Sequence, residues 1–156
     1  MAVTSYAIAL GSNRRSRWGS PAQTLRAAAD ALGVEQMSRV RTTEAVGPAG
    51  RAFANAAALL ASPLDPAELL ALLKQTERDF GRRPGRRWGP RVLDLDILLW
   101  SDGPFARRGL VVPHQAFRTR AFVLDPLAEI APGWRDPMTG LSVRQLLHRL
   151  ARQAAG

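Results

Sequence analysis

The chain contains no cysteine and only one lysine, Lys74. The lack of cysteine excludes disulfides, thiolate zinc sites and cysteine nucleophiles. No Gly-Lys-Ser or Gly-Lys-Thr sequence is present, which excludes a P-loop. The longest apolar run, Ala56 to Ala61, is too short to span a bilayer, and no basic segment followed by an apolar stretch begins the chain. These absences predict a cytoplasmic protein with no membrane partner.

What the chain does contain is arginine. Of its 22 basic residues all but Lys74 are arginine, and against 13 acidic residues they give a net charge of +9. A phosphate site here must therefore be built from guanidinium groups and metal. The positive field favours an anionic ligand, either a nucleotide or a nucleic acid. With 156 residues, 46% of them hydrophobic, the chain is expected to form one domain over residues 1–156.

Hydrophobic periodicity and turn signals predict alternating strands and helices. Ser20 and Asp65 are expected to cap two helices that each begin at a proline, and Gly33 is expected to end the first. The expected strands are 6–10, 34–43, 53–61, 93–99 and 110–112, and the expected helices are 21–32, 66–80, 122–130 and 142–151. The order β-α-β-β-α-β predicts an α+β, ferredoxin-like sandwich with an additional C-terminal strand and helices. The helices are expected to cover one face of an antiparallel sheet.

Two aspartates in the fourth long strand are the sharpest chemical signal. Asp94 and Asp96 share one face of the strand, because side chains alternate, and Leu98 and Trp100 are expected to extend that face. The opposite face is expected to be the core face, with Leu93, Leu95, Ile97 and Leu99. Neighbouring carboxylates repel each other unless a divalent cation lies between them. The pair therefore indicates a two-magnesium phosphoryl-transfer site, and the alternative is a solvated acidic face.

An arginine-rich loop leads into this strand. It carries Arg82, Arg83, Arg86, Arg87 and Arg91, with glycines between them, and is expected to close over a charged substrate. Arg91 precedes Asp94 by three residues and is expected close to the metal site. The alternative for this loop is a solvated basic segment that touches RNA.

A third pattern indicates a slot for a flat heterocycle. Phe53 and Asn55 share a strand face, and Phe122 is a candidate for the opposite wall. The alternative is an edge aromatic beside an amide near a turn. His114, which follows Pro113 in a loop, is a candidate phosphate contact or simply satisfies a backbone group.

Taken together, these motifs resemble one family, the 6-hydroxymethyl-7,8-dihydropterin pyrophosphokinases of the folate pathway. The most specific similarity is Arg87-Trp88-Gly89-Pro90-Arg91-x-x-Asp94-Leu95-Asp96-Ile97-Leu98. Supporting segments are Ala9-Leu10-Gly11-Ser12-Asn13, Arg41-Thr42, Gly47-Pro48, Phe53-x-Asn55-Ala56-Ala57, Val112-Pro113-His114, Arg120-x-Phe122 and Pro126-Leu127-x-Glu129-Ile130-Ala131-Pro132. The chain departs from the family at Phe53, where a tyrosine is common, and in a shortened arginine loop.

The resemblance implies a monomeric magnesium-dependent enzyme that transfers pyrophosphate from ATP to the pterin hydroxymethyl oxygen and releases AMP. ATP and the pterin are its expected partners, with no nucleic acid, and two Mg²⁺ ions are its expected cofactors. Asp96 is also expected to assist with the hydroxyl proton. The implied catalytic residues are Arg82, Arg91, Asp94 and Asp96, with the two aspartates as metal ligands. The implied pterin contacts are Thr42, Val46, Phe53, Asn55, Trp88 and Phe122. The implied nucleotide contacts are Glu77, Arg87, Ile97, His114 and Arg120.

Two alternatives remain open from the sequence. A basic, ferredoxin-like RNA-binding module would explain the charge and the arginine loop, but it would not explain paired aspartates in a core strand. A different metal-dependent phosphotransferase would share the aspartates and the arginines.

Overall fold

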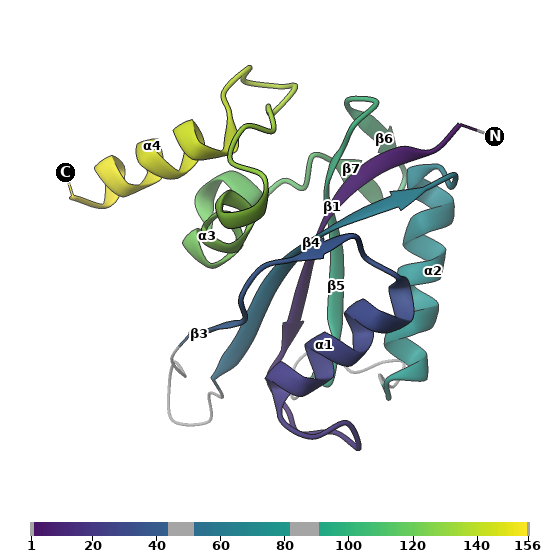
Figure 1. The fold of residues 1–156 in the computed structure, drawn as a ribbon. Coiled ribbons are helices and arrows are strands. Elements are labelled where there is room, and N and C mark those ends of the chain that lie inside the picture. The colour runs from purple at the N-terminus through teal and green to yellow at the C-terminus, as the bar shows by residue number, and fades with distance from the viewer. Residues whose placement is uncertain (1, 44–51, 82–90, 156) are drawn as a thin grey trace.

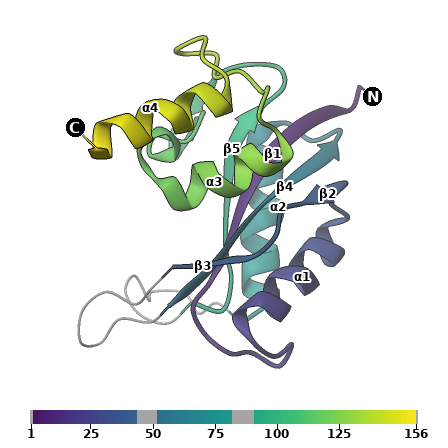
Figure 2. The same ribbon diagram turned by 60° about the vertical axis from the view of Figure 1, so that its left-hand side comes forward.

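A computed structural model, which describes residues 2–43, 52–81 and 91–155, shows a five-stranded antiparallel sheet with helices on both faces (Figures 1 and 2). The strand order is β2-β4-β1-β5, and β3 also pairs with β4. In chain order the elements are β1 (Thr4–Ser12), α1 (Pro21–Leu32), β2 (Gln36–Met37), β3 (Arg41–Thr43), β4 (Phe53–Ser62), α2 (Pro66–Asp79), β5 (Asp94–Trp100), β6 (Phe105–Arg107), β7 (Leu110–Val112), the 3₁₀ turn η1 (Phe117–Thr119), α3 (Ala121–Ile130) and α4 (Val143–Ala155).

The topology is the expected ferredoxin-like one. Strands β2 and β3 together occupy the edge beside β4, so the chain runs β-α-β-β-α-β through β5. Helices α1 and α2 pack on one face of the sheet. Their core includes Leu25 of α1, Leu69 and Leu73 of α2, and Ile8 and Leu10 of β1, all buried.

The first two helices begin as the sequence predicts. Ser20 accepts a hydrogen bond from the Gln23 N–H, and the Gln23 side chain accepts one from the Ser20 N–H. Asp65 and Glu68 form the same reciprocal pair at α2. Gly33 ends α1 in the left-handed conformation, with φ 68°. Local capping chemistry therefore sets where both helices start.

The opposite face is also covered, in part, which the sequence analysis did not anticipate. Helices α3 and α4 and the turn η1 pack there against Ala7, Ala57, Leu98 and Leu99. Phe117, Leu124, Leu127, Val143 and Leu146 supply the helical side of this second core. In both views α3 and α4 gather over one end of the sheet (Figures 1 and 2). Among the described residues, the second core does not extend to the other end of this face.

The expected strand 34–43 is interrupted. Ser38 pairs with Ala57 through its own N–H, but its hydroxyl, rather than a backbone carbonyl, accepts the Ala57 N–H at 3.0 Å. The next N–H, that of Arg39, donates to the Glu129 carboxylate of α3 at 2.8 Å. The side chain of Ser38 therefore breaks the ladder between β2 and β3.

A register shift in β5 changes which face its last residues occupy. Ile97 pairs with Ile8 and Leu99 pairs with Ala7, so Leu98 is an extra residue without a partner on β1. Beyond this bulge Leu99 joins the second core and Trp100 joins the first. The expected positions of Leu99 and Trp100 are therefore wrong, whereas those of Leu93, Leu95, Ile97 and Leu98 are confirmed.

A short hairpin follows β5. Strand β6 lies outside the strands expected from the sequence, and it pairs with β7. Farther along, buried Asp136 binds Arg118, Thr139 and the Met138 N–H and so fastens η1 to the loop before α4. Helix α4 runs four residues beyond its expected end. No helix in the described ranges is long and apolar enough to cross a membrane.

Candidate active site

The part of the sheet face left outside the second core carries the polar residues of the adjacent strands β4, β1 and β5. Gly11 of β1 pairs with Asn55 of β4 on one side and with Asp94 of β5 on the other. Directly paired residues share a face, so these strands present one continuous surface. We call this surface the shelf; it consists of Gly11, Phe53, Asn55, Asp94 and Asp96.

Gly11 is the floor of the shelf. A Cβ atom added there would lie 3.6 Å from Asn55 Oδ1 and 3.8 Å from Phe53 Cδ1, which are ordinary contact distances. The glycine therefore leaves open a space between the amide and the aspartates that any larger side chain would fill. Gly11 belongs to the family-like segment Ala9-Leu10-Gly11-Ser12-Asn13, and its position at the end of an apolar strand is the sequence signal for this role.

Asp94 and Asp96 lie side by side on this surface, as expected. Burial and the neighbouring Asp94 charge raise the pKa of Asp96, while His114, Lys74 and Arg120 act in the opposite direction. Arg91 Nη1 lies 3.8 Å from Asp94 Oδ1. Asn13, just beyond β1, donates its N–H to the Arg91 carbonyl at 3.0 Å and so fixes the segment that carries Arg91.

This donor set fits a hard divalent cation. A half-buried carboxylate beside a second carboxylate is the arrangement in which a cation relieves both repulsion and desolvation. Among the described residues no three His, Asp or Glu side chains gather around one point. Two carboxylates alone would leave most ligand positions of a magnesium ion for substrate oxygens and water, as is usual for Mg²⁺ bound with a nucleotide.

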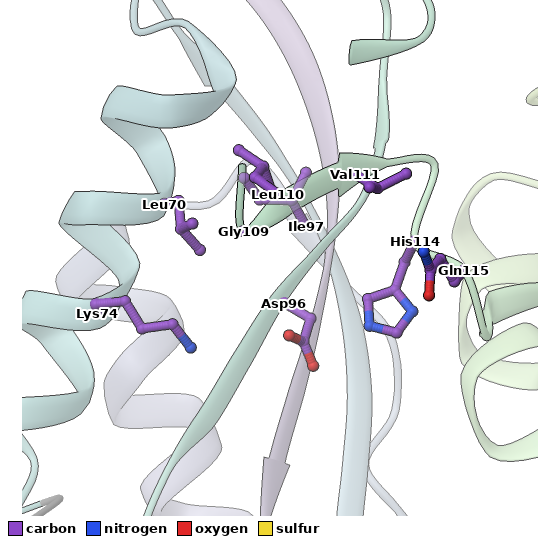
Figure 3. A pocket seen from close by; sticks show the side chains of 9 residues that line it. All are labelled: Leu70, Lys74, Asp96, Ile97, Gly109, Leu110, Val111, His114 and Gln115. Carbon is purple, nitrogen blue, oxygen red and sulfur yellow. The ribbon is translucent and has the colours of Figure 1, made fainter. Parts of the chain in front are cut away.

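A cavity of about 470 Å³ adjoins the shelf at the outer edge of β5 (Figure 3). Its walls come from α2, β5, the β6–β7 hairpin and the segment after β7. Leu70, Ile97, Gly109, Leu110 and Val111 form its apolar part, and Lys74, Asp96, His114 and Gln115 its polar part. We call it the edge cavity. Asp96 belongs to both the shelf and the edge cavity, so a ligand in each would meet at the aspartates.

His114 is held at the edge cavity by backbone groups. Its N–H donates to the Leu98 carbonyl at 3.1 Å, at the bulge of β5. Its Nδ1 accepts the Ala116 N–H at 3.1 Å, so the proton of the neutral ring lies on Nε2. The β-bulge at Leu98 therefore also positions His114 as a hydrogen-bond donor in the wall of the edge cavity, to which Asp96 also belongs.

Glu77 was expected among the nucleotide contacts, but it does not line the edge cavity. Its side chain is 1% exposed, and its carboxylate accepts the Leu95 N–H at 2.8 Å and pairs with Lys74 at 3.3 Å. The carboxylate therefore fastens α2 to the outer edge of β5. Lys74, Gln115 and the 109–111 segment are cavity residues that sequence analysis missed; their contacts form only when α2 and the hairpin pack beside β5.

The remaining predicted residues do not all lie on the shelf. Thr42 pairs with Ala54, whose side chain belongs to the first core, so Thr42 faces away from the shelf. Thr43 faces the shelf instead, and its hydroxyl is 3.5 Å from Asn55 Nδ2. Phe122 is 41% exposed near the start of α3, with the Arg120 guanidinium 5.7 Å from its ring centroid. Val46, Arg82, Arg83, Arg86, Arg87 and Trp88 lie outside the described residues.

Comparison with known proteins agrees with this geometry. Residues 7–132 match the model of the family described as 7,8-dihydro-6-hydroxymethylpterin-pyrophosphokinase (HPPK). The chain belongs to this family. A Bacillus subtilis protein named 2-amino-4-hydroxy-6-hydroxymethyldihydropteridine pyrophosphokinase is 38% identical over 152 residues, which is 96% of this chain and 91% of that protein. A Synechocystis protein of the same name is 40% identical over 75% of this chain, and the match spans 60% of the Synechocystis protein.

Solved HPPK structures show the same fold. A Plasmodium falciparum HPPK-DHPS crystal structure matches 97% of this chain and 46% of the longer chain, with a TM-score of 0.78 and 12% sequence identity. This likeness confirms the ferredoxin-like α+β fold. Membership of the HPPK family supports the function expected from the sequence, transfer of pyrophosphate from ATP to hydroxymethyldihydropterin in folate biosynthesis.

Proposed function

We propose that this protein transfers the terminal pyrophosphoryl group of ATP to the hydroxymethyl oxygen of 6-hydroxymethyl-7,8-dihydropterin on the surface where the shelf meets the edge cavity. The observation that carries the proposal is that Asp96 belongs to both. The pterin would lie on the shelf, with its amide edge at Asn55 and its ring against Phe53 and Phe122. ATP would lie in the edge cavity.

The residues of this chain then have separate tasks. Asn55 would select the heterocycle by hydrogen bonding, over the space that Gly11 leaves open. His114 Nε2 would donate to a phosphate oxygen. Arg91, beside Asp94, and Arg82 would stabilise charge on the transferred group and on AMP. Arg120 would add positive charge from the start of α3.

Asp94 and Asp96 are proposed to hold two Mg²⁺ ions, whose chemistry when bound is to neutralise and orient the phosphates. In the reaction a bond forms between the hydroxymethyl oxygen and the β-phosphorus. The bond from that phosphorus to the bridging α,β-oxygen breaks, and its electron pair stays on AMP. The hydroxyl proton leaves to Asp96 or water. Positioning of the two substrates in line supplies much of the rate.

A phosphorus NMR time course with magnesium and ATP tests the proposal, with and without the pterin. We expect AMP and a new pyrophosphate ester only when the pterin is present, and no turnover when EDTA replaces magnesium. ADP or free phosphate would instead indicate a different phosphotransferase. No reaction with either mixture would contradict the proposed activity.

The remaining expectations stay predictions. These are a single pyrophosphokinase domain over residues 1–156, a monomer and a cytoplasmic location. The nucleotide roles of Glu77, Ile97 and Arg87, and the pterin roles of Thr42, Val46 and Trp88, are likewise proposals. Glu77 would act indirectly through the α2–β5 contact, and Thr42 only through its backbone, since its side chain faces away from the shelf.

A further inference from the structure

Lys74 is the only lysine of the chain, and its ammonium group reaches the edge cavity (Figure 3). The side chain is 39% exposed, so a ligand in the cavity can reach it. Figure 3 shows its nitrogen directed from α2 toward the space beside Asp96. No sequence motif pointed to this residue.

The ammonium is held in place by Glu77. Glu77 follows Lys74 by three residues, lies 3.3 Å from Nζ and is itself fixed to β5 through the Leu95 N–H. This pair restrains a flexible side chain that would otherwise sample solvent. An ammonium has three donors, so the contact with Glu77 leaves donors for a ligand.

The position of Lys74 along α2 matches one part of a nucleotide. Leu70, one turn earlier on the same helix, belongs to the apolar part of the edge cavity with Ile97 and Leu110. The two α2 residues are separated by about 6 Å along the helix axis, at 1.5 Å per residue. A base against the apolar part would therefore place the ribose and the first phosphate beside Lys74, and the later phosphates toward Asp96 and His114.

We propose that Lys74 binds the α-phosphate of ATP and stabilises the negative charge that this phosphate gains as AMP leaves. The inference rests on the proposed function. When the β-phosphorus bonds to the hydroxymethyl oxygen, the electron pair of the breaking bond remains on the α-phosphate oxygen. A fixed cation there binds the leaving group more strongly than the ground state, so it would raise turnover as well as affinity.

Calorimetric binding of AMP and adenosine to the full chain separates this contact from other effects, because adenosine lacks the phosphate. Lys74→Gln removes the charge but keeps a donor for Glu77, and Lys74→Arg keeps the charge. Arg78→Gln is the matched control, since Arg78 is an exposed cation of the same helix that does not line the cavity. Thermal unfolding of each variant reports whether α2 still packs on β5.

We expect Lys74→Gln to weaken AMP binding about tenfold, which is about 1.4 kcal/mol, and to leave adenosine binding unchanged. Turnover at saturating ATP should fall at least tenfold, the KM for the pterin should stay the same, and Lys74→Arg should restore most of both losses. Arg78→Gln should bind AMP like the wild type.

Unchanged AMP binding in Lys74→Gln, or an equal loss of AMP and adenosine, would overturn the phosphate contact. Unchanged turnover would overturn the leaving-group role. A wild-type protein that binds neither ATP nor AMP would instead overturn the proposed function itself.

Discussion

The two faces of the sheet differ in how completely they are covered. Helices α1 and α2 cover one face along the length of the central strands, with Tyr6, Ile8 and Leu10 of β1 all buried beneath them. On the other face α3 and α4 reach Ala7 and Ala57, and the buried second core ends before Gly11, Asn55 and Asp94. Packing therefore stabilises the fold on one face and stops short on the other. Substitutions on the two faces should affect different measurements.

Asp96→Asn should show the largest effect on activity. Turnover should fall at least about 10²- to 10³-fold, because one of the two proposed metal carboxylates is lost. The thermal stability, in contrast, should not fall. The pKa of Asp96 is raised in the folded protein, so its favourable contribution to stability is fully present below its ordinary value of 3.8 and is lost as pH rises through the raised value. At pH 7 the uncharged asparagine should therefore leave the Tm equal or higher.

Initial rates of AMP formation and thermal unfolding followed by circular dichroism measure both effects. Asp102→Asn, which makes the same change at an exposed position just after β5, is the control and should alter neither. Retained turnover together with a lower Tm in Asp96→Asn would contradict the assignment of Asp96 to the open face.

Leu73→Ala tests the closed face. Leu73 of α2 is fully buried in the first core, and its truncation should lower the free energy of unfolding by about 2–5 kcal/mol. At a temperature where the variant is folded, its kcat and both KM values should match the wild type. Urea denaturation gives the first quantity and steady-state kinetics the second. Leu72→Ala, on the same helix but 43% exposed, should cost less than about 0.5 kcal/mol.

Asp136→Asn should show a stability effect that depends on pH. Burial alone would raise the pKa of Asp136, but hydrogen bonds from Arg118, Thr139 and the Met138 N–H lower it to about 2. Its stabilisation is therefore fully present above 3.8 and is lost as pH falls through about 2. We expect the variant to be less stable by about 3 kcal/mol at pH 7. The difference from wild type should shrink between pH 4 and pH 2; a constant difference would contradict this ion pair.

Gly11→Ala should have the smallest effect and the most selective one. The added methyl group meets Asn55 and Phe53 at contact distance, so the Tm should stay within about 1 °C while the methyl occupies the shelf. The KM for the pterin should rise about three- to tenfold, and the KM for ATP should not change. Gly133→Ala, where a Cβ would meet nothing within 4 Å, is the control. An increase in the KM for ATP instead would place the pterin elsewhere.

Local signals were sufficient to predict much of this fold. The capping pairs at Ser20 and Asp65 act within four residues. Alternation of side chains along β5 correctly placed Asp94 and Leu95 on opposite faces of the sheet. The predicted strand bounds and side-chain faces failed where contacts between strands, rather than local sequence, determine the backbone. Ser38 interrupts an expected strand because its hydroxyl binds Ala57, and the bulge at Leu98 reverses the faces of Leu99 and Trp100.

The shelf could be predicted from sequence better than the edge cavity. Asn55, Asp94 and Asp96 can be recognised in the sequence because they are polar residues within otherwise apolar strands. Lys74 and Gln115 become cavity residues only through packing of separate elements around β5. Thr42 and Thr43 are adjacent threonines on opposite faces of the sheet, and composition could not decide which of them faces the shelf. Residues whose role depends on register or on an inserted hairpin therefore need the structure.

The most direct test of the proposed function is a crystal structure of the protein with magnesium, the pterin and a nonhydrolysable α,β-methylene analogue of ATP. We expect the pterin ring on the shelf, between Asn55 and the aspartates, and the nucleotide in the edge cavity with its phosphates directed to Asp96. A pterin or nucleotide bound on the α1–α2 side of the sheet, or away from Asp94 and Asp96, would contradict it.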